Sequence, residues 1–236
     1  MKILGVDSSG LVATVALVED DNLLAEYTLN YKKTHSQTLL PMLDEITRMT
    51  ELDLSSIDAI AVAAGPGSFT GLRIGAATVK GLGLALDKPI IPVPTVDGLA
   101  YQLWGTSDLI CPLMDARRKQ TYTGIYGFED GAFTVLEPQC AVAIEEIITK
   151  VNALGRPVIF LGDGVSVFAD DIAKTCTVPY RFAPAHRSKQ SAAAVATLGL
   201  QYMDEGKAIP ADEFRPEYLR LSQAERERLE KEQKES

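Results

Sequence analysis

The sequence predicts an α/β protein of two lobes, the second of them reduced, because one order of strands, turns and helices occurs twice along the chain. Its 236 residues are 46% hydrophobic and 23% charged, the mixture of an ordinary globular protein. In both copies a short apolar run ends at an aspartate, two extended segments follow, and a helix leads to a buried strand and a glycine loop. We therefore interpret the chain as an internal duplication.

The first copy opens with three segments that are typical of consecutive antiparallel strands. Residues 2–6 are apolar and end at Asp7 in the turn sequence Asp-Ser-Ser-Gly, residues 11–18 are apolar again, and residues 23–31 alternate. Residues 35–50 carry apolar side chains at the spacing of one helical face, which predicts an amphipathic helix. These side chains are Leu39, Leu40, Met42, Leu43, Ile46 and Met49. Leu40 lies off the centre of the stripe that the other leucines form with Met42 and Ile46, and an apolar arc wider than one face indicates a second contact.

A glycine loop follows the next predicted strand. Residues 57–64 form a continuous apolar run, as in a strand buried on both faces, and lead into the sequence Gly-Pro-Gly-Ser-Phe-Thr-Gly-Leu-Arg of residues 65–73. A helix rich in small residues is predicted over residues 74–86, and a strand over residues 89–93. The loop can hold an anion at the start of this helix, or its glycines can permit close packing, which we favour.

The second copy follows the same plan more loosely. Its first apolar run ends at Asp115, and its last ends in the glycine loop Gly-Asp-Gly. The predicted segments are, in order, strands over residues 109–114, 121–128 and 133–137, a helix over residues 143–151 and a strand over residues 157–161.

The domain boundaries follow from this order. We place a first lobe at residues 1–104, a smaller second lobe at residues 105–220 and a charged C-terminal tail at residues 221–236. Residues 191–204 form a last predicted helix, with Ser191 or Ser188 as its cap, and this helix can join the first lobe.

Composition limits the function classes. The net charge of −9 argues against a protein that grips nucleic acid by itself, since that requires clustered Lys and Arg. The three cysteines are far apart and form no CxxC pair, which supports neither a zinc site nor a disulfide framework. An early aspartate argues against a signal peptide, and no apolar run approaches the roughly 20 residues that span a bilayer. We expect a cytoplasmic protein without a membrane partner.

The local sequences resemble one family within the actin-like ATPase and sugar-kinase superfamily. The glycine loop of residues 65–75, the preceding His35-Ser36 with Leu-Leu-Pro at residues 39–41, and Met-Asp-Ala-Arg-Arg at residues 114–118 are similar to those of the TsaB (YeaZ) family. So is Arg-Pro-Glu-Tyr-Leu-Arg at residues 215–220. This resemblance covers about residues 1–220.

The resemblance implies an actin-like, ribonuclease-H-like fold and a non-catalytic role. Members of the family are accessory subunits that bind and activate the TsaD transferase, which attaches a threonylcarbamoyl group to the adenosine beside the tRNA anticodon. A TsaE-type ATPase joins the assembly, tRNA is met only through the complex, and the subunit alone is expected to be a homodimer. Thr95 and Leu99 stand where the catalytic paralogue has its metal-binding histidines, so no metal is expected. No cofactor is implied, with weak nucleotide binding left open.

The resemblance also implies a partner interface on the two helices of the first lobe. In the family these helices form a four-helix contact with TsaD or with a second copy. The alternative is that the apolar stripe is core within one chain. The candidate interface residues are Leu39, Met42, Leu43, Ile46, Ala77 and Gly81.

A vestigial anion or nucleotide site is the second candidate. Asp7 ends the first strand, where kinases of the superfamily place a metal–nucleotide aspartate, although the Ser-Ser-Gly after it departs from their pattern. Asp115 and Arg118 occupy the matching place in the second copy, and Gly65 and Gly67 lie in the glycine loop. For both aspartates an ordinary turn is the alternative.

No catalytic residue is assigned. The two histidines lie in unlike contexts, and Pro66 removes the first glycine of a nucleophile elbow around Ser68. Two rival functions are kept: an ATPase or small-molecule kinase, favoured by the duplicated lobes and Asp7, and, more weakly, a peptidase.

Overall fold

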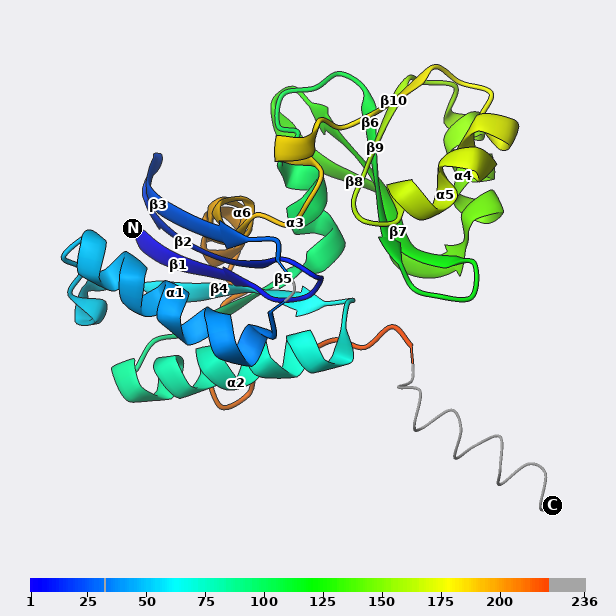
Figure 1. Ribbon diagram of the computed structural model, residues 1–236. Coiled ribbons are helices and arrows are strands. Elements are labelled where there is room, and N and C mark those ends of the chain that lie inside the picture. Colours follow the sequence, from blue (N-terminus) through cyan, green and yellow to red (C-terminus); the bar gives the residue numbers. More distant parts are fainter. Residues whose placement is uncertain (32, 221–236) are drawn as a thin grey trace, which may run out of the picture.

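The computed structural model describes residues 1–31 and 33–220, which form two five-stranded sheets covered by helices (Figure 1). The first sheet has the order β3-β2-β1-β4-β5. Its first three strands are antiparallel neighbours, and the other two run parallel to β1. The strands are β1 (Lys2–Asp7), β2 (Ala13–Glu19), β3 (Asn22–Leu29), β4 (Ala59–Gly65) and β5 (Ile90–Pro94).

Helices cover both faces of this first sheet. One face carries α1 (His35–Met49) and α2 (Phe69–Leu86), and the other carries α6 (Ala192–Asp204). The central strand β4 shows why both faces are buried: Ile60 and Val62 pack among residues of α1 and α2, whereas Ala61 faces α6. A Cβ on Gly199 would lie 2.7 Å from the Cβ of Ala61, so small residues bring α6 close to the sheet.

The second sheet has the order β10-β9-β6-β7-β8. Its helices α4 (Ile144–Leu154) and α5 (Val165–Thr175) pack on one face, in a core that includes Phe160 and Phe168. The strands are β6 (Leu109–Asp115), β7 (Gln120–Glu129), β8 (Ala132–Ala143), β9 (Val158–Leu161) and β10 (Tyr180–Phe182).

The predicted duplication is confirmed. In both sheets the first strand pairs antiparallel with the second and the second with the third, and two further strands extend the sheet in parallel from the first. In both, a helix joins the third strand to the fourth, and another follows the fourth strand. The parallel strands are shorter in the second copy, four residues in β9 and three in β10.

Helix α3 (Thr95–Tyr101) packs between the two sheets (Figure 1). Its residues Val96, Leu99 and Ala100 are buried together with Ile110 of β6 and Tyr126 of β7. The connection from the first sheet to the second is therefore a packed apolar seam.

The prediction assigns residues 105–220 to the second lobe, but the last part of this range, from α6 onward, packs against the first lobe. From α6 to about Glu217 the chain lies on the first lobe: the backbones of Ile209 and Ile90 exchange hydrogen bonds, and Phe214 is buried among residues of α2 and β4. The physical reason is that α6 supplies the cover for the otherwise bare alanine face of β4. The tail predicted at residues 221–236 lies outside the described residues.

Several element limits also differ from the prediction. Helix α2 begins at Phe69 rather than at residue 74, because the hydroxyl oxygen of Ser68 accepts the N–H of Gly71 at 3.3 Å and caps the helix. Strand β8 continues six residues beyond its predicted end at residue 137. The predicted cap Ser191 is confirmed, since its hydroxyl oxygen accepts the N–H of Ala194. No prediction covers α5 or β10, and two short 3-10 turns complete the fold, η1 (Leu54–Ser56) and η2 (Ala185–Arg187).

Candidate functional site

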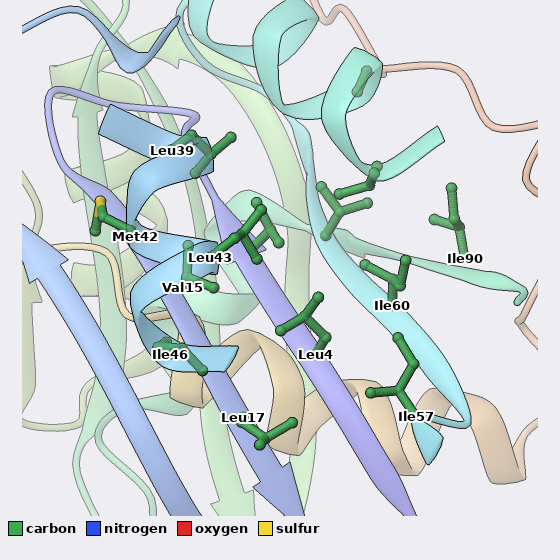
Figure 2. Packing of buried hydrophobic residues seen from close by; sticks show 14 of the residues in the cluster. Leu4, Val15, Leu17, Leu39, Met42, Leu43, Ile46, Ile57, Ile60 and Ile90 are labelled. Carbon is green, nitrogen blue, oxygen red and sulfur yellow. The ribbon is translucent and has the colours of Figure 1, made fainter. Parts of the chain in front are cut away.

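The predicted apolar stripe of α1 faces the core of its own chain. Figure 2 shows its side chains directed toward the strands, near Leu4, Val15 and Leu17. The stripe consists of Leu39, Met42, Leu43 and Ile46, and each of these side chains is at most 7% exposed. Assigning them to a partner interface is therefore wrong, because the sheet of the same chain already covers them.

The outer sides of the two helices carry a different set of residues. Ala77 and Gly81 of α2 are exposed, as an interface requires, and apart from the adjacent backbone of α2 no atom lies within 4 Å of where a Cβ on Gly81 would be. Leu84 follows one turn later at 60% exposure, and Leu40 of α1 is 58% exposed. Helices α1 and α2 pack side by side (Figure 1), and we call Leu40, Ala77, Gly81 and Leu84 the α1–α2 surface.

Sequence reasoning reached only part of this surface. Leu40 lies off the centre of the buried stripe, and that position indicates a second contact. Leu84 was missed, although Ala77, Gly81 and Leu84 recur at i, i+4 and i+7, the spacing of one helical face. An exposed small-residue face that continues into an exposed leucine on α2, with a further exposed leucine on the neighbouring helix α1, is typical of a surface on which another helix packs.

The glycine loop lies against the protein's own backbone. A Cβ on Gly65 would meet the carbonyl oxygen of Glu217, and a Cβ on Gly67 would meet that of Ser9. The N–H of Ser68 donates to Ser9 O at 2.7 Å, and Gly65 has a φ of +122°, which only glycine adopts readily. The observed contacts therefore give both predicted anion-site glycines a packing role.

Asp7 is buried at the end of β1, beside this loop. Its Oδ1 accepts the N–H of Ser9 at 2.8 Å and the hydroxyl of Ser9 at 2.6 Å. Burial raises the pKa of Asp7 to about 6, while the Ser9 hydrogen bonds and the nearby His35 oppose that rise. His35 in turn contacts Gly10 O through Nε2 at 2.8 Å. The carboxyl thus closes a local turn, which is the alternative that the sequence left open.

The residues predicted to match Asp7 in the second copy, Asp115 and Arg118, lie on the turn between β6 and β7. Oδ1 of Asp115 accepts the N–H of Arg117 at 2.8 Å, and Oδ2 pairs with the Arg117 guanidinium at 3.2 Å. Arg118 is exposed on the same turn, at a φ of +54°. The structure brings Asp7, Gly65 and Gly67 to one end of the first sheet, whereas Asp115 and Arg118 belong to the second.

Residues 209–220, which we call the C-terminal strap, connect these regions. The N–H of Glu217 donates to Ala64 O at 2.7 Å, and its Oε2 accepts the side-chain N–H of Gln139 on β8 at 2.9 Å. The ring of Tyr218 stacks on Phe69 at 4.3 Å between centroids, and the guanidinium of Arg220 donates to the carbonyl oxygen of Ala116. The strap therefore crosses from the start of α2 to the second lobe.

The segment predicted from the resemblance to match the histidine positions of the catalytic paralogue forms α3. Thr95 and Leu99 are both buried, and the Thr95 hydroxyl oxygen accepts the N–H of Gly65 at 3.2 Å. Over residues 1–31 and 33–220, no group of three or more His, Cys, Asp or Glu side chains is placed to share a metal ion. Within the same residues, no helix combines the length and the apolarity that crossing a membrane requires.

Comparisons with known proteins agree with this architecture. The family model described as "TsaD: tRNA N6-adenosine threonylcarbamoyltransferase" matches residues 22–228. The chain is 32% identical to the tRNA threonylcarbamoyladenosine biosynthesis protein TsaB of Bacillus subtilis (strain 168), over 95% of this chain and 96% of the relative.

Two solved structures confirm the predicted fold class. YeaZ from Pseudomonas aeruginosa superposes with a TM-score of 0.78 at 26% identity, covering 92% of this chain and 99% of that one. The ROK hexokinase of Thermus thermophilus superposes with a TM-score of 0.50 at 12% identity, covering 85% of this chain and 99% of that one, a likeness of fold alone. The duplicated sheets are those of the actin-like ATPase fold.

Proposed function

The chain belongs to the TsaB family, whose members take part in threonylcarbamoyladenosine synthesis on tRNA, and from that premise we propose that it is a non-catalytic subunit that binds and activates a TsaD-type transferase. The observation that carries the proposal is the α1–α2 surface. Its small residues admit a helix backbone closely, and Leu40 and Leu84 supply apolar area for a partner.

The proposal extends to the other members of the assembly. A TsaE-type ATPase and the tRNA would join through the complex in the cytoplasm, and the isolated chain would pair with a second copy through the same α1–α2 surface. Thr95 supports a role without chemistry, since its hydroxyl is engaged in holding the glycine loop.

The test is complex formation between this chain and its host's TsaD-type transferase, measured by calorimetry and size-exclusion chromatography. We expect wild type to form a stoichiometric complex and Leu84→Glu or Ala77→Arg to weaken it by about tenfold or more, the effect of a central interface residue. Both positions are exposed, so the variants should fold as wild type does, which circular dichroism would check.

Leu154→Glu is the matched control, since Leu154 is also exposed but ends α4 in the second lobe. Equal affinity of wild type, Leu84→Glu and Ala77→Arg would contradict the assigned surface. Absence of any complex between two folded proteins would contradict the proposed function. A Leu43→Glu variant is unsuitable, because Leu43 lies in the core.

An ATPase or small-molecule kinase is the alternative, favoured by the fold shared with a hexokinase. It requires Asp7 to reach a metal–nucleotide complex, whereas the carboxyl of Asp7 is buried and accepts two hydrogen bonds from Ser9. ATP turnover by the purified chain would favour this alternative.

A further inference from the structure

A cavity of about 470 Å³ opens where the end of α3 meets β9, β10 and η2. Its lining residues include two aromatic residues, Trp104 and Phe182, and two arginines, Arg181 and Arg187. We propose that this cavity binds one unstacked nucleotide of a single-stranded RNA segment, with the base on Trp104 and a phosphate beside Arg187. The inference rests on the proposed function, because it adds an RNA contact to a subunit of a tRNA-modifying assembly.

The aromatic part of the cavity is unusually open. Trp104 is 64% exposed, and Phe182 on β10 is 41% exposed. The indole meets the ring of Phe128 edge-on at 6.4 Å between centroids, and Phe128 packs with Tyr101 in the seam between the lobes. Trp104 is therefore the exposed end of a packed ring cluster. A ring held at one edge and open to solvent over most of its area is a suitable platform for a nucleic-acid base.

The two arginines of the cavity differ in whether an acidic side chain pairs with them. Arg181 pairs with Asp108 at 2.8 Å, and that carboxylate would repel a phosphate nearby. Arg187 has no acidic partner within ion-pair distance among the residues that the structure describes. In a chain with a net charge of −9, an unpaired guanidinium beside exposed rings is a local exception to the overall charge. We therefore assign the phosphate contact to Arg187.

Single-stranded RNA fits this combination better than other partners do. Bases splayed out of a loop stack on aromatic rings or guanidinium planes, whereas a duplex keeps its base faces stacked inside and offers mainly phosphates and 2′-hydroxyls. An acidic peptide would use the arginine but leave the indole without a stacking partner. The negative net charge implies that this contact is weak alone and adds to contacts elsewhere in the assembly.

The chain offers its own probe, because Trp104 is its only tryptophan. An unstructured RNA hexanucleotide, titrated into the intact chain at low salt, is expected to quench the indole fluorescence saturably, and added salt should weaken the binding. A duplex RNA of the same length should quench little. Arg187→Glu should weaken hexanucleotide binding by about tenfold, whereas the control Lys174→Glu, which reverses an exposed charge on α5, should not.

Four outcomes of this titration would overturn the assignment. These are no quenching up to about 1 mM hexanucleotide, equal binding by Arg187→Glu and wild type, equal quenching by the duplex or by poly-glutamate, and equal affinity for free AMP. The last would make the ligand a free nucleotide rather than RNA.

The second arm uses the complex with the TsaD-type transferase and a labelled anticodon stem-loop RNA. Trp104→Ala is expected to join the complex as wild type does and to weaken RNA binding by about tenfold, the effect of losing one stacked base. The control is Tyr31→Ala, which removes an exposed ring from the first lobe. Unchanged RNA affinity in an intact complex would overturn the inference and leave the proposed function standing. Quenching of the free chain by the hexanucleotide, together with no complex formation, would instead support the RNA contact and contradict the proposed function.

Discussion

At the scale of single residues, Asp7 shows how burial changes the role of a carboxyl group. Its side chain is buried at the end of β1, and burial raises its pKa from 3.8 to about 6 although Ser9 donates two hydrogen bonds. The folded protein therefore holds the proton more tightly than the unfolded chain does. The resulting stabilisation is complete below about pH 4, falls as the pH rises, and is lost above about pH 6.

Asp7→Asn removes this titration while keeping an oxygen that can accept from Ser9. We expect the variant to be more stable than wild type at neutral pH, by up to about 3 kcal/mol for a pKa difference of about two units. The gain should grow between about pH 4 and pH 6 and then stay constant. Urea unfolding of both proteins across that range measures it. A gain that does not depend on pH, or a loss at every pH, would contradict a buried, proton-linked Asp7.

At the scale of elements, the sequence predicts where the helices and strands lie along the chain better than it predicts what packs against each of them. The spacing of Leu39, Met42, Leu43 and Ile46 correctly indicates one apolar face on α1, because helical periodicity is a local property. Whether a sheet of the same chain or a partner covers that face depends on tertiary packing, which one sequence does not encode locally. For the same reason the sequence predicts the glycine loop but does not predict that the loop packs against Ser9 and Glu217.

Two glycines of α2 allow the effect of close backbone packing to be measured separately from the effect of intrinsic helix propensity. A Cβ on Gly71 would collide with the carbonyl oxygen of Ser8, whereas a Cβ on Gly81 would meet open space. We expect Gly71→Ala to destabilise the protein by about 1–3 kcal/mol through this clash with backbone. Gly81→Ala should stabilise the monomeric chain by about 0.5–1 kcal/mol, since alanine is the better helix former.

Thermal or urea unfolding of the two α2 variants beside wild type provides the measurement. Opposite signs are the expected result, and each variant serves as the control for the other. If both substitutions stabilise the protein, then α2 does not pack on the turn after β1 as closely as described. If both destabilise it, the outer face of α2 at Gly81 is not open.

At the scale of the whole molecule, the chain returns to its first lobe after building its second. The sequence predicts the duplicated order of elements, which is read locally, and leaves open where the last helix packs. It does not predict that residues 209–220 return along the first sheet and then cross to the second lobe, since Ile209 pairs with Ile90 across more than a hundred residues of intervening chain. Nor does it predict the cavity beside Trp104, whose walls come from segments far apart in the sequence.

The seam between the lobes contains a buried carboxyl group that joins three elements. Oδ1 of Asp97 on α3 accepts the hydroxyl of Tyr126 on β7 at 2.7 Å, and Oδ2 accepts that of Tyr202 on α6 at 2.9 Å. Burial raises the pKa of Asp97, while the two tyrosine hydroxyls oppose the rise by stabilising the carboxylate. This group therefore couples the second sheet to the helix that covers the first.

Tyr126→Phe removes one of these donors without changing the packing of the ring. We expect it to destabilise the protein by about 1–3 kcal/mol, the cost of leaving a buried acceptor with fewer donors. Because the lost hydrogen bond favours the carboxylate, the pKa of Asp97 should rise further, and the destabilisation should grow as the pH rises through it. Urea unfolding at several pH values from about pH 4 to about pH 8 tests both parts. Tyr27→Phe, at an exposed ring on β3, should change neither value. A Tyr126→Phe protein as stable as wild type at every pH would contradict a stabilising hydrogen bond from Tyr126 to Asp97.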